Sequence, residues 1–137
     1  AGLPGAGKDT WLAENRPDLP VVSLDEIRRA EGIDPGENQG AVAWAARERA
    51  REYLRHGRPF AWNATNVTRD LRARVLSGLA AFPARFRIVY VETPWRTLLD
   101  RNRTREHPVP ERVIDRLLDR LDVPDRTEAL GVELAIS

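Results

Sequence analysis

Cysteine is absent from this chain of 137 residues, and so is any apolar run long enough to cross a membrane. Without cysteine the chain forms neither disulfides nor thiolate metal sites, which is compatible with the cytoplasmic location that we predict. Without a candidate spanning segment, we expect no membrane partner. These absences exclude a disulfide-stapled scaffold and a cysteine-dependent enzyme.

An excess of charge of one sign is missing as well, since the formal net charge is only +1. A protein that fills a groove of nucleic acid needs a larger positive excess, so this charge argues against that class. An enzyme that contacts only the end of a strand neutralises about two phosphates and stays compatible. The two histidines, His56 and His107, lie in Arg-rich surroundings, and we interpret them as surface residues rather than a metal pair.

Lysine occurs once, at position 8, and every other basic side chain is an arginine. This lysine follows glycines at the first and sixth positions of the stretch 2–7, a spacing typical of a phosphate-binding loop. In such loops backbone N–H groups surround the phosphates, the lysine reaches the β- and γ-phosphates, and the next helix adds its positive dipole end. A bulkier guanidinium is a poor substitute there. The residues that we predict to bind the nucleotide are Gly2, Pro4, Gly5, Ala6, Gly7, Lys8, Asp9 and Thr10.

The position after the lysine departs from the usual pattern, in which Ser or Thr ligates Mg²⁺ through its hydroxyl. Here Asp9 follows, and then Thr10. A carboxylate beside a triphosphate is repelled unless a cation lies between them or an arginine binds it. Either Asp9 ligates the metal, directly or through water, or Thr10 supplies the hydroxyl and Asp9 is structural. Both are therefore candidate metal ligands.

Short β-rich runs alternate with longer helical patterns, which predicts an α/β fold with a parallel sheet and crossover helices. The predicted strands are 21–24, 60–62, 88–91 and, more weakly, 132–136. The predicted helices are 8–14, 24–30, 41–56, 69–82, 94–105 and a last one containing 112–121, with a loop at 32–40. Ser23 and Thr93 are predicted helix caps. The last helix places leucines on one face and arginines on the other, which we interpret as a solvated face.

Ligands of parallel sheets bind at the carboxyl ends of the strands, so the polar residues after each predicted strand are candidates for the site. These are Asp25 and Arg28, then Thr65 and Asn66 in the stretch 63–66, and then Arg101 and Arg105. Taken singly, each fits an exposed helix or loop residue. Together they suit phosphoryl transfer, in which an Asp orients the attacking hydroxyl and arginines stabilise the moving phosphoryl group. We take Thr65 and Asn66 as candidates for the substrate site.

Five stretches carry a resemblance to a known family. They are Gly-Leu-Pro-Gly-Ala-Gly-Lys (2–8), Leu-Asp-Glu-Ile-Arg (24–28), Asn-Ala-Thr-Asn (63–66), Pro-Trp-Arg-Thr-Leu-Leu-Asp-Arg-Asn-Arg-Thr-Arg (94–105) and Val-Pro-Glu-Arg-Val-Ile (109–114). Across about residues 1–122 the chain resembles the phage-type polynucleotide 5′-kinase family of P-loop phosphotransferases. The third and fourth stretches are the most specific, because most P-loop enzymes lack both.

The resemblance implies that Asp25 is the general base and that Arg28 binds the phosphate next to the acceptor 5′-hydroxyl. It implies that Arg105 contacts the transferring phosphoryl group, with Arg101 beside it in a mobile lid. It further implies ATP or another NTP, and Mg²⁺, as cofactors. Asn63 stands where relatives often carry Asp, so the metal site loses a strand-end acid.

We therefore predict one P-loop kinase-like α/β domain over 1–137, a parallel sheet with helices on both faces and a helical lid. Its predicted reaction moves the γ-phosphate of ATP or another NTP to the 5′-hydroxyl of RNA or DNA. A kinase of a small hydroxyl compound (sugar, nucleotide-sugar or antibiotic) and a non-catalytic nucleotide-binding module are the alternatives.

Because the strand that delivers such a loop is missing before Ala1, we expect the chain to be cut from a longer one, in which a linked phosphatase or ligase domain is an open possibility. We expect 132–136 to form an edge strand. The alternative is that this strand lies directly beside Ala1.

Overall fold

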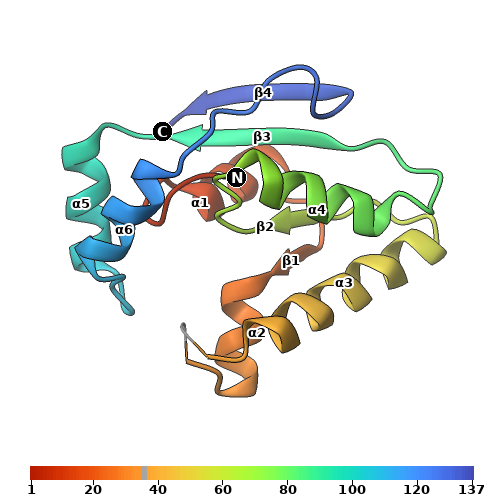
Figure 1. The fold of residues 1–137 in the computed structure, drawn as a ribbon, viewed down its shortest axis with the longest axis horizontal. Coiled ribbons are helices and arrows are strands. Elements are labelled where there is room, and N and C mark those ends of the chain that lie inside the picture. Colours follow the sequence, from red (N-terminus) through yellow and green to blue (C-terminus); the bar gives the residue numbers. More distant parts are fainter. Residues whose placement is uncertain (35–36) are drawn as a thin grey trace. The chain divides into compact units, whose positions relative to one another are not determined.

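The computed structural model describes residues 1–34 and 37–137. At least one helix separates each strand from the next along the chain, and every strand pair among the described residues is parallel, so the predicted α/β class is confirmed (Figure 1). The helices are α1 (Lys8–Asn15), α2 (Leu24–Glu31), α3 (Gln39–Arg55), α4 (Arg69–Leu79), α5 (Trp95–Thr104) and α6 (Glu111–Asp119). The strands are β1 (Val21–Ser23), β2 (Ala61–Asn63), β3 (Arg87–Glu92) and β4 (Gly131–Ile136).

The chain forms two compact units. The first comprises Ala1–Pro17, Thr65–Val75 and Arg85–Ser137, and the second comprises Asp18–Ala64 and Leu76–Ala84. The first unit therefore contains α1, α5 and α6 with the β3–β4 pair, and the second contains α2 and α3 with the β1–β2 pair.

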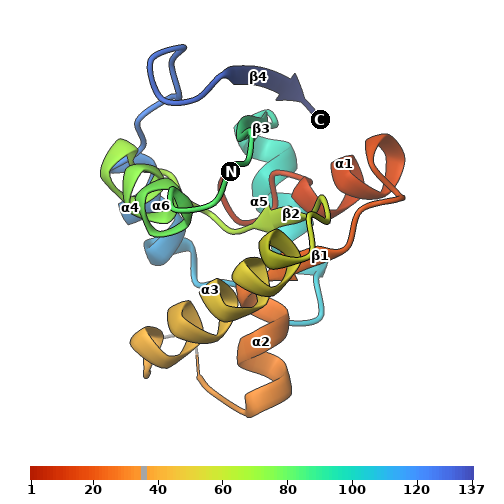
Figure 2. The same cartoon turned by 90° about the vertical axis from the view of Figure 1, so that its right-hand side faces the viewer.

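In the first unit β4 lies alongside β3, as Figures 1 and 2 both show. The Ser137 amide extends this ladder by donating to the Glu92 carbonyl (2.7 Å). Ala1 instead donates to the Val89 carbonyl (2.8 Å) and accepts from the Val91 amide (2.9 Å). Alternate residues of a strand direct their backbone groups to opposite edges, so Ala1 and β4 flank β3 on opposite sides. The prediction that 132–136 does not lie directly beside Ala1 is confirmed.

The core of the first unit joins the segment before α1 to α5 and α6. Leu3, Val67, Leu98 and Ile114 are buried together. The partly buried residues packed against them are Leu99, Val109, Leu117 and Leu121. The apolar stripe predicted for the last helix thus faces the core, although Leu118 remains 43% exposed. The arginines of the other face are exposed, as predicted: Arg112, Arg116 and Arg120.

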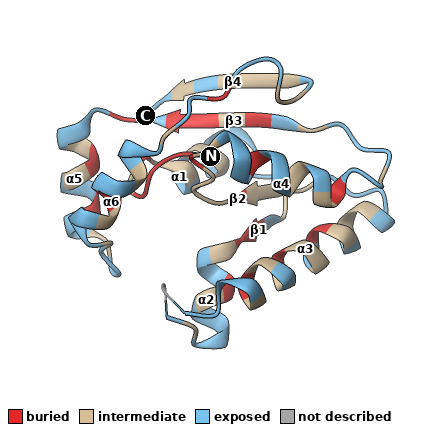
Figure 3. Cartoon of the chain, in the orientation of Figure 1, coloured by how far each residue is buried: buried red, intermediate tan, exposed pale blue. Residues whose placement is uncertain are grey.

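The second unit packs α2 and α3 against β1. Val22, Ile27, Val42 and Ala46 form its buried cluster. The buried residues of α3 recur at every fourth position, ending at Ala50, and they lie along one side of the helix in Figure 3. This spacing is that of an amphipathic helix, so the packing follows from the sequence pattern.

The two predicted helix caps have different outcomes. Ser23 caps α2, because its hydroxyl accepts a hydrogen bond from the Glu26 amide (3.3 Å). Thr93 does not cap α5, since Pro94 precedes the helix and the Thr93 hydroxyl donates to the Ser137 carbonyl (2.9 Å). The prediction for Thr93 was therefore wrong, and its side chain ties the end of β3 to the end of β4.

Two helix boundaries differ from the prediction. α4 ends at Leu79 rather than at position 82, and the chain continues in turns, in which the amides of Ala80 and Phe82 donate to the carbonyls of Ser77 and Leu79 (both 3.3 Å). α3 begins at Gln39, inside the predicted loop 32–40, and residues 35–36 of that loop lie outside the described residues. Within the described ranges, none of the helices combines the length and apolarity that crossing a membrane requires.

Candidate functional site

The segment between Ala1 and α1 follows a path that glycine adopts most easily. Gly2, Gly5 and Gly7 have φ values of +150°, +83° and +98°, where residues with a Cβ are rare. Gly7 directly precedes α1, so the loop runs into the first turn of that helix. The first amides of a helix have no intrahelical partner and carry the positive end of its dipole. The loop thus has the geometry of an anion-binding site.

Two of these glycines also lie so close to other parts of the chain that a side chain would collide with them. A Cβ at Gly2 would lie 2.5 Å from the Val91 carbonyl oxygen, and one at Gly7 would lie 2.6 Å from the Ser137 hydroxyl oxygen. The first clash is with backbone, so it can be relieved only by a backbone shift, whereas the second can be relieved if the Ser137 side chain moves. The loop is therefore packed against the carboxyl end of β3 and the residue after β4, the edge at which parallel sheets bind ligands.

We expect Gly2→Ala to destabilise the protein more than Gly57→Ala. Both glycines have positive φ, +150° and +62°, but a Cβ at Gly57 meets nothing within 4 Å. Gly57→Ala should therefore cost about 1–2 kcal/mol, the scale of the left-handed backbone penalty. Gly2→Ala should cost at least about 1 kcal/mol more, because the backbone of Val91 has to move. Urea unfolding of both variants measures the difference, and equal costs would show that this backbone yields freely.

Lys8 lies over the loop that precedes it. Its half-buried side chain donates from Nζ to the carbonyls of Gly2 (2.9 Å) and Leu3 (3.1 Å). The Lys8 ammonium therefore lies beside the loop, into which the first amides of α1 also lead. An anion in the loop would meet both, which is the arrangement that the spacing of the motif predicts.

Arg101 reaches the same loop from α5. Its Nη1 donates to the Ser137 hydroxyl (2.9 Å) and, at 3.5 Å, to the Ala6 carbonyl. Arg105 follows the last residue of α5 with extended backbone and is half-buried. Among the described residues, the structure thus brings Arg101 but not Arg105 into hydrogen-bonding contact with the loop.

The two candidate metal ligands, Asp9 and Thr10, are exposed in the first turn of α1. No cluster of three or more His, Cys, Asp or Glu side chains that could hold a metal is present within residues 1–34 and 37–137. Protein-bound Mg²⁺ usually takes one or two carboxylate or hydroxyl ligands and completes its shell with water and phosphate oxygens. A single Asp9 or Thr10 oxygen beside the loop fits that requirement, whereas a metal site made of protein ligands alone does not.

Thr65 and Asn66 lie half-buried between β2 and α4. The Thr65 carbonyl accepts a hydrogen bond from the Gly2 amide (2.9 Å), so its backbone holds the first residue of the loop. Asn66 has a positive φ of 39°, and its carbonyl accepts from Arg72 Nη1 (3.0 Å). The backbone of Thr65 thus contacts the loop directly and that of Asn66 contacts Arg72, and the assignment of both residues to the substrate site stays a prediction.

Asp25 and Arg28 bind each other on α2 of the second unit. Arg28 Nη1 donates to Asp25 Oδ1 at 2.7 Å, as the three-residue spacing allows. The Asp25 side chain is 63% exposed and that of Arg28 21%. Gln39 completes the group, because its Oε1 accepts from Arg28 Nε (3.2 Å) and Nη2 (2.7 Å). The guanidinium is thus held by two partners while the carboxylate faces solvent.

The sequence analysis missed two residues that contact the candidate site residues, Gln39 and Ser137. Gln39 was assigned to a loop, and only its place at the start of α3 brings it to Arg28. Ser137 was left out although it follows a predicted strand, and the rule that polar residues after strands form the site would have found it. Its hydroxyl accepts a hydrogen bond from Arg101 (2.9 Å) and lies 2.6 Å from the position that a Cβ at Gly7 would take.

Comparison with known proteins gives a family and a fold. Residues 1–124 match the family described as AAA domain, and no curated protein matches the chain. A gluconokinase from Sinorhizobium meliloti 1021 has a TM-score of 0.61 and 17% identity over 98% of this chain and 78% of its own. An unliganded sugar kinase from a Janibacter species has a TM-score of 0.66 and 17% identity over 98% of this chain and 81% of its own.

At this identity the structural likeness shows the fold alone, which is that of P-loop kinases. Neither of these two neighbours is named as a polynucleotide kinase, so the resemblance seen in the sequence is supported only at the level of this fold. The match over 1–124 shows that the chain belongs to the AAA domain family.

Proposed function

We propose that this chain is a kinase that transfers the γ-phosphate of ATP, or of another NTP, to an alcohol hydroxyl. The observation that carries the proposal is the loop before α1. Its glycines have positive φ, the first turn of α1 opens onto it, and the Lys8 ammonium lies over it. These features together are what a triphosphate requires, and a chance turn rich in glycine would not combine them.

The charged residues of the first unit take separate roles in this reaction. Lys8 binds the β- and γ-phosphates and holds them in place. Arg101, already at the loop, stabilises the charge of the moving phosphoryl group, with Arg105 as its partner from the end of α5. Asp9 or Thr10 would hold a Mg²⁺, which would neutralise phosphate charge when bound.

The first candidate acceptor is the 5′-hydroxyl end of RNA or DNA. Asp25 orients the hydroxyl and finally accepts its proton, and Arg28 binds the phosphate on the 3′ side of the acceptor nucleoside. The Asp25–Arg28–Gln39 group supports this assignment, since its carboxylate is open to solvent and its guanidinium is held in place. The other support is the resemblance of the stretch 24–28 to the polynucleotide 5′-kinase family.

The second candidate is a small hydroxyl compound, above all a sugar. Two solved structures of similar fold are named as a gluconokinase and a sugar kinase, so the comparisons favour this candidate over a polynucleotide. A sugar acceptor would use Asp25 in the same way. It would not require Arg28 to recognise a phosphate.

An acceptor assay separates the two candidates. We expect the wild-type protein to transfer labelled γ-phosphate to adenosine 3′-monophosphate and to 5′-hydroxyl oligonucleotides faster than to adenosine or gluconate. Arg28→Ala should lower kcat/KM about tenfold or more for the phosphate-bearing acceptors and much less for adenosine, because one charge-assisted contact is lost. Equal losses for both acceptor types, or preferential use of gluconate, would favour the small-molecule kinase.

Metal dependence tests the unusual residue after the lysine. We expect Asp9→Ala to raise the Mg²⁺ concentration needed for half-maximal activity, and Asp9→Ser to restore most of it, because Ser supplies the commoner metal-facing hydroxyl. Titration of activity with Mg²⁺ in the three proteins measures this. An unchanged requirement in both variants would assign the metal to Thr10 or to phosphate and water alone.

A further inference from the structure

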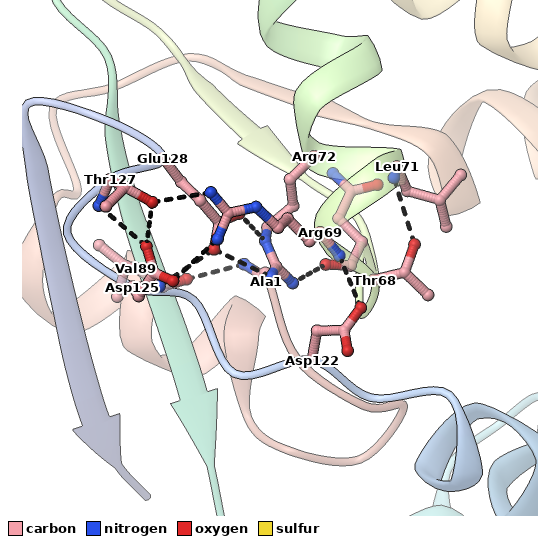
Figure 4. Close-up of polar contacts among 11 residues, drawn as sticks. Ala1, Thr68, Arg69, Leu71, Arg72, Val89, Asp122, Asp125, Thr127 and Glu128 are labelled. Carbon is pink, nitrogen blue, oxygen red and sulfur yellow. Dashed lines mark hydrogen bonds and ion pairs between the residues drawn. The ribbon is translucent and has the colours of Figure 1, made fainter.

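A buried ion pair links α4 to the segment before β4 in the first unit (Figure 4). Arg72 Nε and Nη2 donate to the two carboxylate oxygens of Glu128 at 2.8 and 3.2 Å. The side chains are 3% and 5% exposed. The Asp125 amide also donates to Glu128 (3.0 Å). Although burial raises the pKa of Glu128, hydrogen bonds from Arg72 and the Asp125 amide, with the nearby arginine charges, outweigh this and lower it. Glu128 therefore stays ionised at neutral pH.

The third nitrogen of the Arg72 guanidinium binds the turn that holds the phosphate-binding loop. Arg72 Nη1 donates to the Asn66 carbonyl (3.0 Å), and Asn66 has the unusual positive φ of 39°. The carbonyl of the preceding residue, Thr65, accepts from the Gly2 amide (2.9 Å). A continuous path thus runs from Glu128 through Arg72 and the 65–66 turn to the first glycine of the loop.

We propose that Arg72 is a positioning residue for the phosphate-binding loop, that Glu128 orients it, and that the pair sets the affinity for nucleotide. The inference rests on the proposed function of the loop. The described hydrogen bonds of the Arg72 side chain go to Glu128 and to the Asn66 carbonyl, so it acts on the loop through the 65–66 turn.

The chemistry of the pair supports a role beyond packing. A buried ion pair is commonly replaced by apolar side chains of similar size without loss of stability. Apolar side chains would fill the same space between α4 and the segment before β4. They would not hold the Asn66 carbonyl, which needs a donor. The guanidinium fork supplies that donor while its other two groups bind Glu128, and no other side chain has this geometry.

The experiment compares stability with nucleotide affinity. The variants are Arg72→Met, which leaves Glu128 buried without its partner, and Arg72→Met/Glu128→Met, which removes both charges. We expect the single variant to lose both thermal stability and ATP affinity. The double variant should regain most of the wild-type Tm but still bind Mg·ATP about tenfold more weakly in calorimetry, the scale of one charge-assisted hydrogen bond. Arg72→Lys, which keeps a positive charge beside Glu128, should fold and show the same weakened binding.

Arg69 provides the matched control on the same helix. It binds Asp125 (2.8 Å) and Thr127 (2.7 Å) in the same segment, but its side chain is 53% exposed (Figure 4). Arg69→Met should leave ATP affinity at the wild-type value. Recovery of affinity together with Tm in the double variant, or an equal loss in Arg69→Met, would overturn the proposal. Failure of the wild-type protein to bind ATP would instead overturn the proposed function, and this inference with it.

Discussion

Lys8→Ala is expected to abolish measurable phosphoryl transfer, a fall of about 10³-fold or more, and Lys8→Arg is expected to lower kcat at least about tenfold. The ammonium of Lys8 lies within hydrogen-bonding distance of two loop carbonyls, at 2.9 and 3.1 Å. A compact point charge can approach both of these carbonyls at once. The planar guanidinium is larger and spreads the same charge over a fork, so its placement against a phosphate would be different.

Steady-state kinetics with labelled ATP measure both variants, and thermal unfolding shows whether they are folded. Arg112→Ala is the matched control, because this arginine is exposed on the solvent face of α6. It should keep the wild-type rate. A near-normal rate for Lys8→Arg would show that the loop does not bind phosphate in the proposed way.

Local patterns were sufficient to predict most of the fold. The glycine and lysine spacing predicted a phosphate-binding loop, and in the structure Gly2, Gly5 and Gly7 have the positive φ that suits a tight loop before a helix. The Ser23 cap and the four predicted strands depended only on neighbouring residues, so they were found within two residues of their observed bounds. The helix-cap prediction for Thr93 failed because a hydrogen bond to a distant residue replaced the local one. Thr93 has the sequence of a helix cap, but the end of β4 offers its hydroxyl a carbonyl acceptor.

The parts of the site that were missed depend on contacts between distant residues. Arg72 and Glu128 are separated by 56 positions, and nothing in the sequence pairs this arginine with this glutamate. Gln39 was missed for another reason. Asn38 precedes α3, and asparagine is a residue type that commonly precedes a helix, but the sequence analysis started this helix at 41 and left Gln39 in the loop. Sequence reasoning thus named charged residues at strand ends and could not assign their partners.

Asp25→Asn is expected to lower kcat by about 10² or more while the acceptor KM changes little. Asparagine keeps the size of the side chain and can still accept a hydrogen bond from Arg28, so the acceptor group should stay assembled. It cannot take up the proton that the attacking hydroxyl releases. The 63% exposure of the Asp25 side chain leaves the carboxylate accessible to an acceptor, since only one of its oxygens is bound by Arg28 (2.7 Å).

Glu26→Gln is the matched control for this variant, because Glu26 is the other acid in the first turn of α2 and is also exposed. If Asp25 mattered only by placing negative charge near the start of the helix, both variants would lose the same small amount, a few tenths of a kcal/mol of stability, and no rate. A general base predicts a loss of kcat in Asp25→Asn alone. A drop in kcat for Arg28→Ala as large as that for Asp25→Asn, with either kind of acceptor, would mean that Arg28 serves only to hold the carboxylate. The group would then recognise a hydroxyl and no phosphate, and a sugar would become the better acceptor.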